Sequence, residues 1–349
     1  MGHTAIWIAK DNNLVVKHIK TAYVPGDREI LVKVAYHAIN PADIKHATIL
    51  GINDCVAGYD FSGIVASAGS NSKFKKGDAV FGTTPSDSGE GRKPEWGTYQ
   101  DWLICPDPMA MLVPANLPLP DASGLSIVTR VAADTIFNMF QFPLEFGDRK
   151  INKPFLIWGA GSVGYGCLQF AAAIGIHPIF ITASPICHQE LIKAGATECF
   201  DYQEPDVVQK IRKTMTTKYP NVKLMYGFDA VGSHGPPHTA DLVEQCCEPG
   251  AKIFTATEHP RYGAPFATRE YNWRISTPKG KIVAPLANAG FAAVVQKALE
   301  WAVKNYGTKY RIPPVRLVKG VKGTIKAANE VAWKGVLFQK VVVEHPFEG

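Results

Sequence analysis

The stretch FLIWGAGSVGYGCLQFA, Phe155–Ala171, sets three glycines between an apolar run and a helix-like run: Gly159, Gly161 and Gly164. Their spacing, G-x-G-x-x-G, is informative only where a strand precedes it and a helix follows. The residues predict both elements, a strand over 154–158 and a helix over 162–174. We therefore expect a dinucleotide-binding turn whose helix N-terminus faces a pyrophosphate. A plain strand–helix turn and a methyltransferase-type nucleotide site are the alternatives.

Strands and helices continue to alternate on the C-terminal side of this turn. Strands are predicted over 177–182, 198–201, 223–229 and 251–256, and helices over 185–194, 205–217 and 238–247. Such alternation is typical of a parallel, doubly wound sheet. On the N-terminal side, short strand signals dominate up to about residue 121. The predicted class is α/β, with a β-rich domain beside a Rossmann domain.

Length and composition narrow the kind of protein. The 349 residues suggest about two domains. A net charge of +6 without a long basic block does not favour nucleic-acid binding. Seven cysteines occur without a CxxC pair, which is typical of a reduced intracellular protein. No apolar leader and no run of 18 apolar residues is present, so we expect a cytoplasmic protein with no membrane partner.

The end of the second predicted strand points to the cofactor. NAD sites usually place an acidic residue there to bind the ribose 2′-hydroxyl. This chain has Thr182-Ala183-Ser184-Pro185 instead, which leaves room for a 2′-phosphate and favours NADP(H). Ser184 before a proline also matches a helix N-cap. No Arg or Lys stands at this strand end, so His188 and Tyr202 are the candidate phosphate contacts.

Several motifs occur in order along the chain: AINPADIKH (38–46), GYDFSGIVASAGSNSKFKKGDAVFG (58–82), WGTYQDW (96–102), the glycine turn and KAGATECFDY (193–202). Together they resemble the medium-chain dehydrogenase/reductase superfamily over essentially the whole chain. The resemblance implies a GroES-like catalytic domain in two segments, 1–121 and 307–349, with a Rossmann domain over 122–306 between them.

The resemblance is to the zinc-independent branch. Zinc-dependent members carry a Cys ligand and a Gly-His-Glu motif where this chain has Asn40-Pro41 and Gly58-Tyr59-Asp60. We expect no metal, because no thiolate or imidazole stands at those positions. A cluster of His37, Asp43 and His46 is the remaining candidate for a metal site. Within the branch, the motifs most resemble the trans-acting enoyl reductases that serve fungal polyketide synthases.

The resemblance also implies site residues. Lys45 is the candidate proton donor or enolate-binding cation, and Tyr59 is a second candidate donor. The cofactor would contact the glycine turn and a few residues elsewhere: Gly159, Gly161, Ser162, Val163, Gly164, Ser184, His188, Tyr202, Val231 and Lys340. For Lys45 and Tyr59 the alternatives are a surface lysine and a packed core tyrosine, and Lys340 could instead protect a sheet edge.

Two departures from the family pattern bear on the cofactor site. Val131 stands where relatives often have a Thr near the nicotinamide, with Thr129 two residues earlier. Cys187 stands where relatives often have a Lys in the 2′-phosphate loop. These departures keep open a member of the fold that does redox-neutral chemistry or only binds a partner.

The leading hypothesis is an NADPH-dependent enoyl reductase that reduces a polyketide thioester held by a synthase or its acyl carrier domain. A quinone or enone reductase for free small molecules is the second hypothesis. Relatives that dimerise join their sheets through a strand near 275–290, where this chain has Pro278, Lys279, Lys281 and Pro285. Prolines and lysines discourage strand pairing, so a monomer is expected.

Overall fold

The computed structural model describes residues 2–86, 92–147, 149–233, 238–277, 280–284 and 287–347. The chain forms two compact units. Unit 1 comprises Met1–Ile127, Glu270–Ala287 and Pro314–Gly349, and unit 2 comprises Val128–Arg269 and Asn288–Pro313. The boundary between them lies inside helix α2 (Leu119–Ala133), which continues into a π-helical segment, Asp134–Met139. Among the described residues, no helix is both long and apolar enough to span a membrane.

Unit 2 contains a five-stranded parallel sheet in the order β11-β10-β9-β12-β13. Its strands are β9 (Ile151–Trp158), β10 (Ile176–Thr182), β11 (Glu198–Phe200), β12 (Tyr226–Asp229) and β13 (Lys252–Thr255). Its helices are α3 (Ser162–Ala173), α4 (His188–Lys193), α5 (Val207–Lys218), α6 (Thr239–Cys246) and α7 (Ala289–Lys304). The predicted alternation of strands and helices is confirmed, and the strand order is that of a Rossmann fold.

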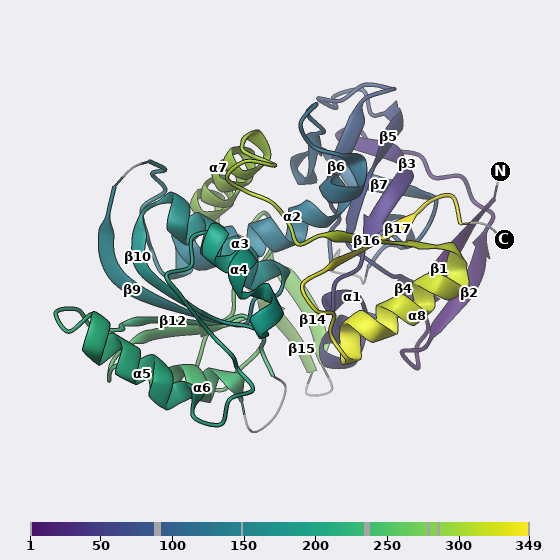
Figure 1. Cartoon of the computed structure of the whole chain (residues 1–349). Helices are drawn as coiled ribbons and strands as arrows, with labels where there is room; N and C mark the ends of the chain where they lie inside the picture. The colour runs from purple at the N-terminus through teal and green to yellow at the C-terminus, as the bar shows by residue number, and fades with distance from the viewer. Residues whose placement is uncertain are drawn as a thin grey trace. The chain divides into compact units, whose positions relative to one another are not determined.

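Helices cover both faces of this sheet (Figure 1). Residues alternate between the faces along β9, as a strand requires. Leu156 and Trp158 belong to the core formed with α5 and α6, where Ile211 packs. Phe155 contacts Phe140 with ring centroids 5.1 Å apart. Two-sided burial explains why the carboxyl half of β9, which leads into the glycine turn, is apolar.

Unit 1 is built on a seven-stranded, mostly antiparallel sheet in the order β16-β17-β3-β5-β6-β8, with β7 paired to β3. These strands are β3 (Glu29–Ala38), β5 (Asp60–Ala68), β6 (Ala79–Thr83), β7 (Trp102–Pro106), β8 (Ala110–Leu112), β16 (Val315–Lys319) and β17 (Lys340–Glu344). A three-stranded sheet contains β2 (Leu14–Ile19), β1 (His3–Ile8) and β4 (Cys55–Val56). Two short 3-10 turns cover Pro94–Trp96 and Asp107–Met109, and a third, in unit 2, covers Pro185–Cys187.

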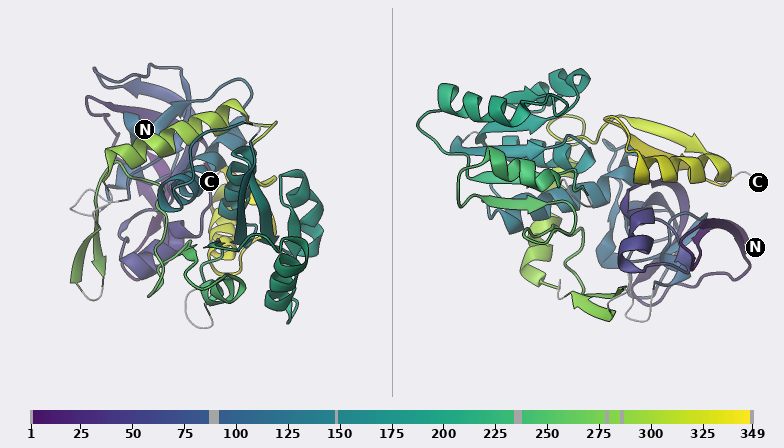
Figure 2. Two further views of the ribbon diagram at one scale, coloured as in Figure 1. Left: turned by 90° about the vertical axis from the view of Figure 1, so that its left-hand side faces the viewer. Right: turned by 90° about the horizontal axis from the view of Figure 1, so that it is seen from below.

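Two helices of unit 1 share one core. Helices α1 (Ala42–Leu50) and α8 (Gly320–Trp333) pack side by side, α1 in purple and α8 in yellow (Figures 1 and 2). Their buried residues join one apolar cluster with β1 and β17. Helix α1 begins at Ala42, so the motif NPADIK leads into a helix. Its side chains Asp43 and Ile44 are buried in unit 1.

The stretch expected to form a sheet edge of the Rossmann domain is a separate hairpin. Strands β14 (Trp273–Thr277) and β15 (Gly280–Ala284) pair with each other in a two-stranded sheet that belongs to unit 1. Pro278, Lys279 and Pro285, which carry the expectation of a monomer, lie outside the described residues. The oligomeric state therefore stays a prediction.

Candidate functional site

The glycine turn has the backbone that its sequence predicts. Gly159 has φ of +97°, and a Cβ on it would lie 2.5 Å from Val231 Cγ2. A Cβ on Gly164 would clash with the carbonyl oxygen of Gly159. Gly159 is thus needed for the turn and Gly164 for close helix–strand packing.

Gly161 has a different role in the turn. It is the N-cap of α3, its backbone is extended, and a Cβ added to it would meet no heavy atom within 4 Å. With Gly at this position, no side chain caps the N–H groups of the first turn, which begins at Ser162 and Val163. An open approach to uncapped N–H groups fits a pyrophosphate. Within unit 2, the residues present therefore fit the phosphate part of a dinucleotide.

The end of β10 lies beside this turn. The Gly159 N–H donates to the Thr182 hydroxyl at 2.9 Å, so Thr182 is used to hold the turn. Ser184 caps the following 3-10 turn through its carbonyl, with no side-chain cap bond, so its hydroxyl is not committed to that turn. The structure thus leaves Ser184, which is partly exposed, as the polar side chain at this strand end.

The other two predicted 2′-phosphate contacts, His188 and Tyr202, have different surroundings. One ring nitrogen of His188, Nε2, lies 3.0 Å from the Ala183 carbonyl, which holds the ring against the β10 end. His188 also lines a groove of about 490 Å³ that includes Asp201 and Lys213. Tyr202 is 47% exposed, whereas Cys187 is buried. Cys187 therefore offers no polar surface in place of the family lysine.

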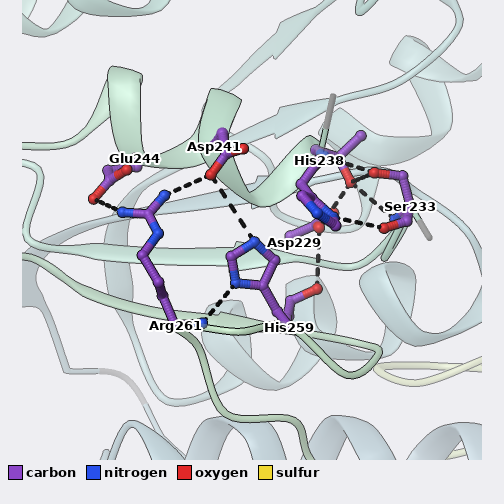
Figure 3. Close-up of polar contacts among 9 residues, drawn as sticks. Asp229, Ser233, His238, Asp241, Glu244, His259 and Arg261 are labelled. Atoms are coloured by element: carbon purple, nitrogen blue, oxygen red, sulfur yellow. Dashed lines mark hydrogen bonds and ion pairs between the residues drawn. The ribbon is translucent and has the colours of Figure 1, made fainter. Parts of the chain in front are cut away.

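The carboxyl ends of β12 and β13 form a polar network that the sequence did not reveal (Figure 3). The buried Asp229 carboxylate accepts N–H bonds from Val231 and Gly232 and hydroxyl bonds from Thr239 and Thr255. These four bonds fix the loop that presents Val231, which is 53% exposed next to Gly159. Asp229 is thus an anchor of the loop, and Val231 is its accessible residue.

The loop after β13 is tied to α6 in the same network. Arg261 bridges Glu244 at 2.8 Å and Asp241 at 2.5 Å. The Arg261 N–H donates to His259 Nδ1 at 3.1 Å (Figure 3). The His259 ring also stacks on Tyr262. These contacts hold two loops at the sheet edge where ligands of open α/β folds bind.

The helix that contains Val131 explains one departure from the family pattern. Thr129 is fully buried, and its hydroxyl is hydrogen-bonded to Tyr310 at 3.1 Å. It is therefore unavailable to a cofactor. Val131 is partly exposed and contributes only its carbonyl, which accepts from Thr135 at 2.8 Å. Neither residue therefore presents a free side-chain hydroxyl in this part of unit 2.

In unit 1, the two predicted catalytic residues lie on or near α1. Lys45 is half-buried, and partial desolvation lowers its pKa. Its Nζ lies 6.0 Å from the centroid of the Trp333 ring. A lysine with a lowered pKa that is still reachable by solvent is suited to proton donation.

Tyr59 is buried, and its environment is specific. Its hydroxyl lies 3.0 Å from His46 Nδ1, and the Arg92 guanidinium lies 4.2 Å from its ring centroid. Burial raises the pKa of Tyr59, and the Arg92 charge acts against that rise. Burial, with Arg92, lowers the pKa of His46 to about 4. His46 is only partly buried, so it joins Tyr59 to the surface of unit 1, a contact that the sequence analysis, which considered His46 only as a metal ligand, did not predict.

Lys340 lies in a buried polar network of unit 1. Its Nζ donates to Asn40 Oδ1 at 2.6 Å and lies 3.8 Å from Asp60 Oδ2, and Asn40 Nδ2 donates to the same Asp60 oxygen at 2.9 Å. Asp43 accepts from the Asn40 N–H and from the Tyr99 hydroxyl. Burial raises the pKa of Asp43 to about 7, with Asp60 adding to the rise. Lys340 is 3% exposed, and these contacts favour a role as internal counterion.

The three side chains considered for a metal site have separate partners. His37 Nδ1 lies 2.6 Å from His345 Nε2, His46 is bonded to Tyr59, and Asp43 to Asn40 and Tyr99. His345 in turn lies 2.8 Å from Asp101. In the part of the chain that the structure describes, no group of three or more His, Cys, Asp or Glu is placed to hold a metal ion.

Comparisons with known proteins agree with this geometry. Residues 26–115 match the family described as alcohol dehydrogenase GroES-like domain. The chain is 27% identical to the trans-enoyl reductase himH of Aspergillus japonicus, over 90% of this chain and 89% of that protein. It is 33% identical to the trans-enoyl reductase RAP2 of Pyricularia oryzae over 59% of each chain. The match to traG of Penicillium crustosum, at 27% identity, covers 70% of this chain and 65% of that protein.

Solved structures show the same fold at low identity. An alcohol dehydrogenase superfamily protein from Novosphingobium aromaticivorans superposes with a TM-score of 0.74 at 20% identity, over 99% of this chain and all of that one. The quinone oxidoreductase of Coxiella burnetii gives 0.68 at 18% identity, also over 99% and 100%. The predicted α/β class, a GroES-like domain plus a Rossmann domain, is confirmed.

The chain contains an alcohol dehydrogenase GroES-like domain over residues 26–115, has the fold of the medium-chain dehydrogenases/reductases and is an oxidoreductase. Its similarity to curated proteins, at 27–33% identity, is to fungal trans-enoyl reductases. The fold implies a nicotinamide cofactor, NAD(H) or NADP(H), which the glycine turn of unit 2 fits.

Proposed function

We propose that the protein is an NADPH-dependent trans-acting enoyl reductase, which reduces the α,β-unsaturated thioester of a polyketide bound to a synthase. The observation that supports this most strongly is the glycine turn, with Gly159 against Val231 and the open position at Gly161. The name trans-enoyl reductase of the relatives supports an enoyl substrate, and the family resemblance of the motifs implies the polyketide synthase partner. When bound, the cofactor supplies a hydride to the substrate Cβ.

NADPH is favoured over NADH by the end of β10. Thr182 is committed to the Gly159 N–H, and the partly exposed Ser184 follows. No carboxylate stands at 182–185 to bind a ribose 2′-hydroxyl and repel a 2′-phosphate. Ser184 would hold the 2′-phosphate, with Tyr202 and His188 as neighbouring polar contacts. Ser162 and Val163 would give their N–H groups to the pyrophosphate.

Lys45 is proposed as the group that balances charge on the substrate. Hydride addition at Cβ leaves negative charge on the thioester oxygen, and the reaction is complete when Cα gains a proton. The Lys45 ammonium can stabilise that oxygen, and its lowered pKa makes it a competent proton donor. Tyr59 and His46 are the second candidate pair, because neutral His46 can return a proton to Tyr59 from the surface.

The test is a comparison of substrates and cofactors under matched conditions. We expect NADPH oxidation with crotonyl-pantetheine or a crotonyl-loaded acyl carrier domain, and slow or no oxidation with simple quinones. Lys45→Met should lower kcat about 100-fold, within the range for general acid catalysis, and leave the Kd for NADPH unchanged. Preference for quinones would favour the free-substrate alternative, and absence of NADPH binding would contradict the proposal.

A further inference from the structure

Helix α8 presents a stripe of four exposed side chains on the side that faces away from its core. Lys322, Lys326, Asn329 and Trp333 follow one another at spacings of three or four residues, which places them on one face of the helix. We call them the basic stripe. The stripe covers about 16 Å at 1.5 Å per residue. The opposite face is buried and includes Thr324, Ala327, Ala328, Val331 and Ala332.

The positive charge of this stripe is not neutralised by its own helix. The sole acidic residue of α8, Glu330, pairs with Arg316 at 2.8 Å. Lys334 directly follows the helix and is also exposed. Among the described residues, no carboxylate forms an ion pair with Lys322, Lys326 or Lys334. The stripe is therefore a local positive surface in a chain whose net charge is +6.

A large aromatic side chain ends the stripe. Trp333 is 58% exposed, although tryptophan is usually well buried and is enriched at protein interfaces. Lys45 lies 6.0 Å from its ring centroid. The stripe thus ends next to the lysine proposed above to act on the substrate.

We propose that the basic stripe docks an acidic helix of the acyl carrier domain that delivers the enoyl chain. This rests on the proposed function and specifies where the partner binds. Two lysines about one turn apart, with an aromatic anchor at the end, match carboxylates and an apolar residue on one partner helix. Docking there brings the acyl chain to the side of unit 1 where Lys45 lies.

The same features fit other partners poorly. Nucleic-acid affinity comes mainly from cations that neutralise backbone phosphates, and this surface offers only Lys322, Lys326 and Lys334. Membrane-surface helices insert an apolar face into the lipid boundary, whereas the apolar face of α8 is buried in the core of unit 1. A folded acidic protein, in contrast, can bind through the exposed basic stripe alone.

Charge reversal on the stripe tests the proposal against a matched control. The variant Lys322→Glu/Lys326→Glu is compared with Lys297→Glu/Lys304→Glu, two exposed lysines of α7. Both double variants change the net charge by the same amount.

Binding of a crotonyl-loaded acyl carrier domain from a fungal polyketide synthase is followed by fluorescence anisotropy in a salt series. We expect the stripe variant to bind about tenfold more weakly and to lose most of its salt dependence, with little change in the control. Trp333→Ala should also weaken binding.

Activity assays separate this proposal from the proposed function. The stripe variant should retain wild-type kcat/KM on crotonyl-pantetheine, which needs no docking, and lose about tenfold on the carrier-bound substrate. Equal effects of the two double variants, or equal losses on both substrates, would overturn the docking proposal. So would binding of anionic vesicles or RNA by the stripe with unchanged carrier binding. Absence of turnover in every variant would contradict the enzymatic proposal, while anisotropy would still decide the docking.

Discussion

The hydroxyl of Tyr59 lies 3.0 Å from Nδ1 of His46. Arg92 covers the Tyr59 ring and is itself held by the carbonyls of Pro85, Val56 and Gly58. Because burial disfavours the imidazolium and a buried cation stands next to the pair, the pKa of His46 is lowered and the ring favours its neutral form. The arrangement makes Tyr59 part of a polar connection from the interior of unit 1 to its partly exposed histidine.

Stability should depend on His46 in acid. The pKa of His46 is lowered from 6.5 to about 4 in the folded protein, so the unfolded chain binds an extra proton between these values. Its contribution is complete above pH 6.5 and is lost as pH falls through 4. Between pH 7 and 4, we expect the free energy of unfolding of His46→Gln to fall by about 3 kcal/mol less than that of wild type, measured by urea unfolding. His18→Gln, at an exposed site on β2, is the control, and parallel pH profiles for wild type and His46→Gln would contradict the assignment.

Gly161→Ala should separate cofactor binding from folding. Its φ of −62° suits alanine, and the added methyl group would meet no protein atom within 4 Å. We expect unchanged thermal stability and an NADPH Kd raised at least about tenfold, because the methyl group occupies the approach to the α3 N–H groups. The control is Gly263→Ala, whose Cβ would make only ordinary contacts. Unchanged NADPH affinity in Gly161→Ala would argue for a plain strand–helix turn.

Ser184→Asp should change the cofactor preference. A carboxylate at this position would repel a 2′-phosphate and accept a hydrogen bond from a 2′-hydroxyl. We expect NADPH to bind about tenfold or more weakly and NADH more tightly, by fluorescence titration. Ile186→Asp adds the same charge at an exposed residue nearby and should have a smaller effect. Loss of both cofactors to the same extent would show that Ser184 does not contact the 2′ position.

Lys340→Met should destabilise unit 1. The ammonium of Lys340 is the cation of a buried network that contains Asp43 and Asp60. Its removal leaves two buried carboxylates without a cation, at a cost of about 3–5 kcal/mol. The raised pKa of Asp43, about 7, means that its stability contribution falls as pH rises from 3.8 to 7. In Lys340→Met, the free energy of unfolding should fall more steeply as the pH rises, and this fall should continue to higher pH than in wild type.

Lys340→Arg is the control for this prediction, because it retains the cation. Unfolding in urea from pH 5 to 8 measures the effect, alongside NADPH titration. If Lys340→Met bound NADPH weakly but kept wild-type stability, Lys340 would be a phosphate ligand, as the family resemblance implies, and its role as an internal counterion would be wrong.

The sequence predicted the architecture of unit 2 well because its signals are local. Apolar strands with two-sided burial, such as β9, and the glycines of the turn are determined by nearest neighbours and backbone geometry. The predicted elements from 154 to 256 correspond closely to β9 through β13 and α3 through α6. The hairpin of β14 and β15 was missed because its strands pair only with each other, and pairing partners are not encoded in a local pattern.

Side-chain partners over long sequence distances were the main omission. His46 and Tyr59, or Lys340 and Asn40, meet only after the sheet and α1 have formed. The motif NPADIK favours a turn by its Asn, Pro and Asp, although it begins helix α1. Asp229 stands at a strand end, but its four hydrogen bonds depend on residues up to 26 positions away. Such contacts leave no periodic signal.

Deuterium placement in the product tests the central claim most directly. A crotonyl-loaded acyl carrier domain is reduced with NADPH carrying deuterium at C4 in H₂O, and separately with unlabelled NADPH in D₂O. We expect one deuterium at Cβ in the first reaction and one at Cα in the second, located by mass spectrometry of the released butyryl group. An unreduced crotonyl group, or deuterium at Cα alone without transfer from NADPH, would contradict hydride reduction of an enoyl thioester.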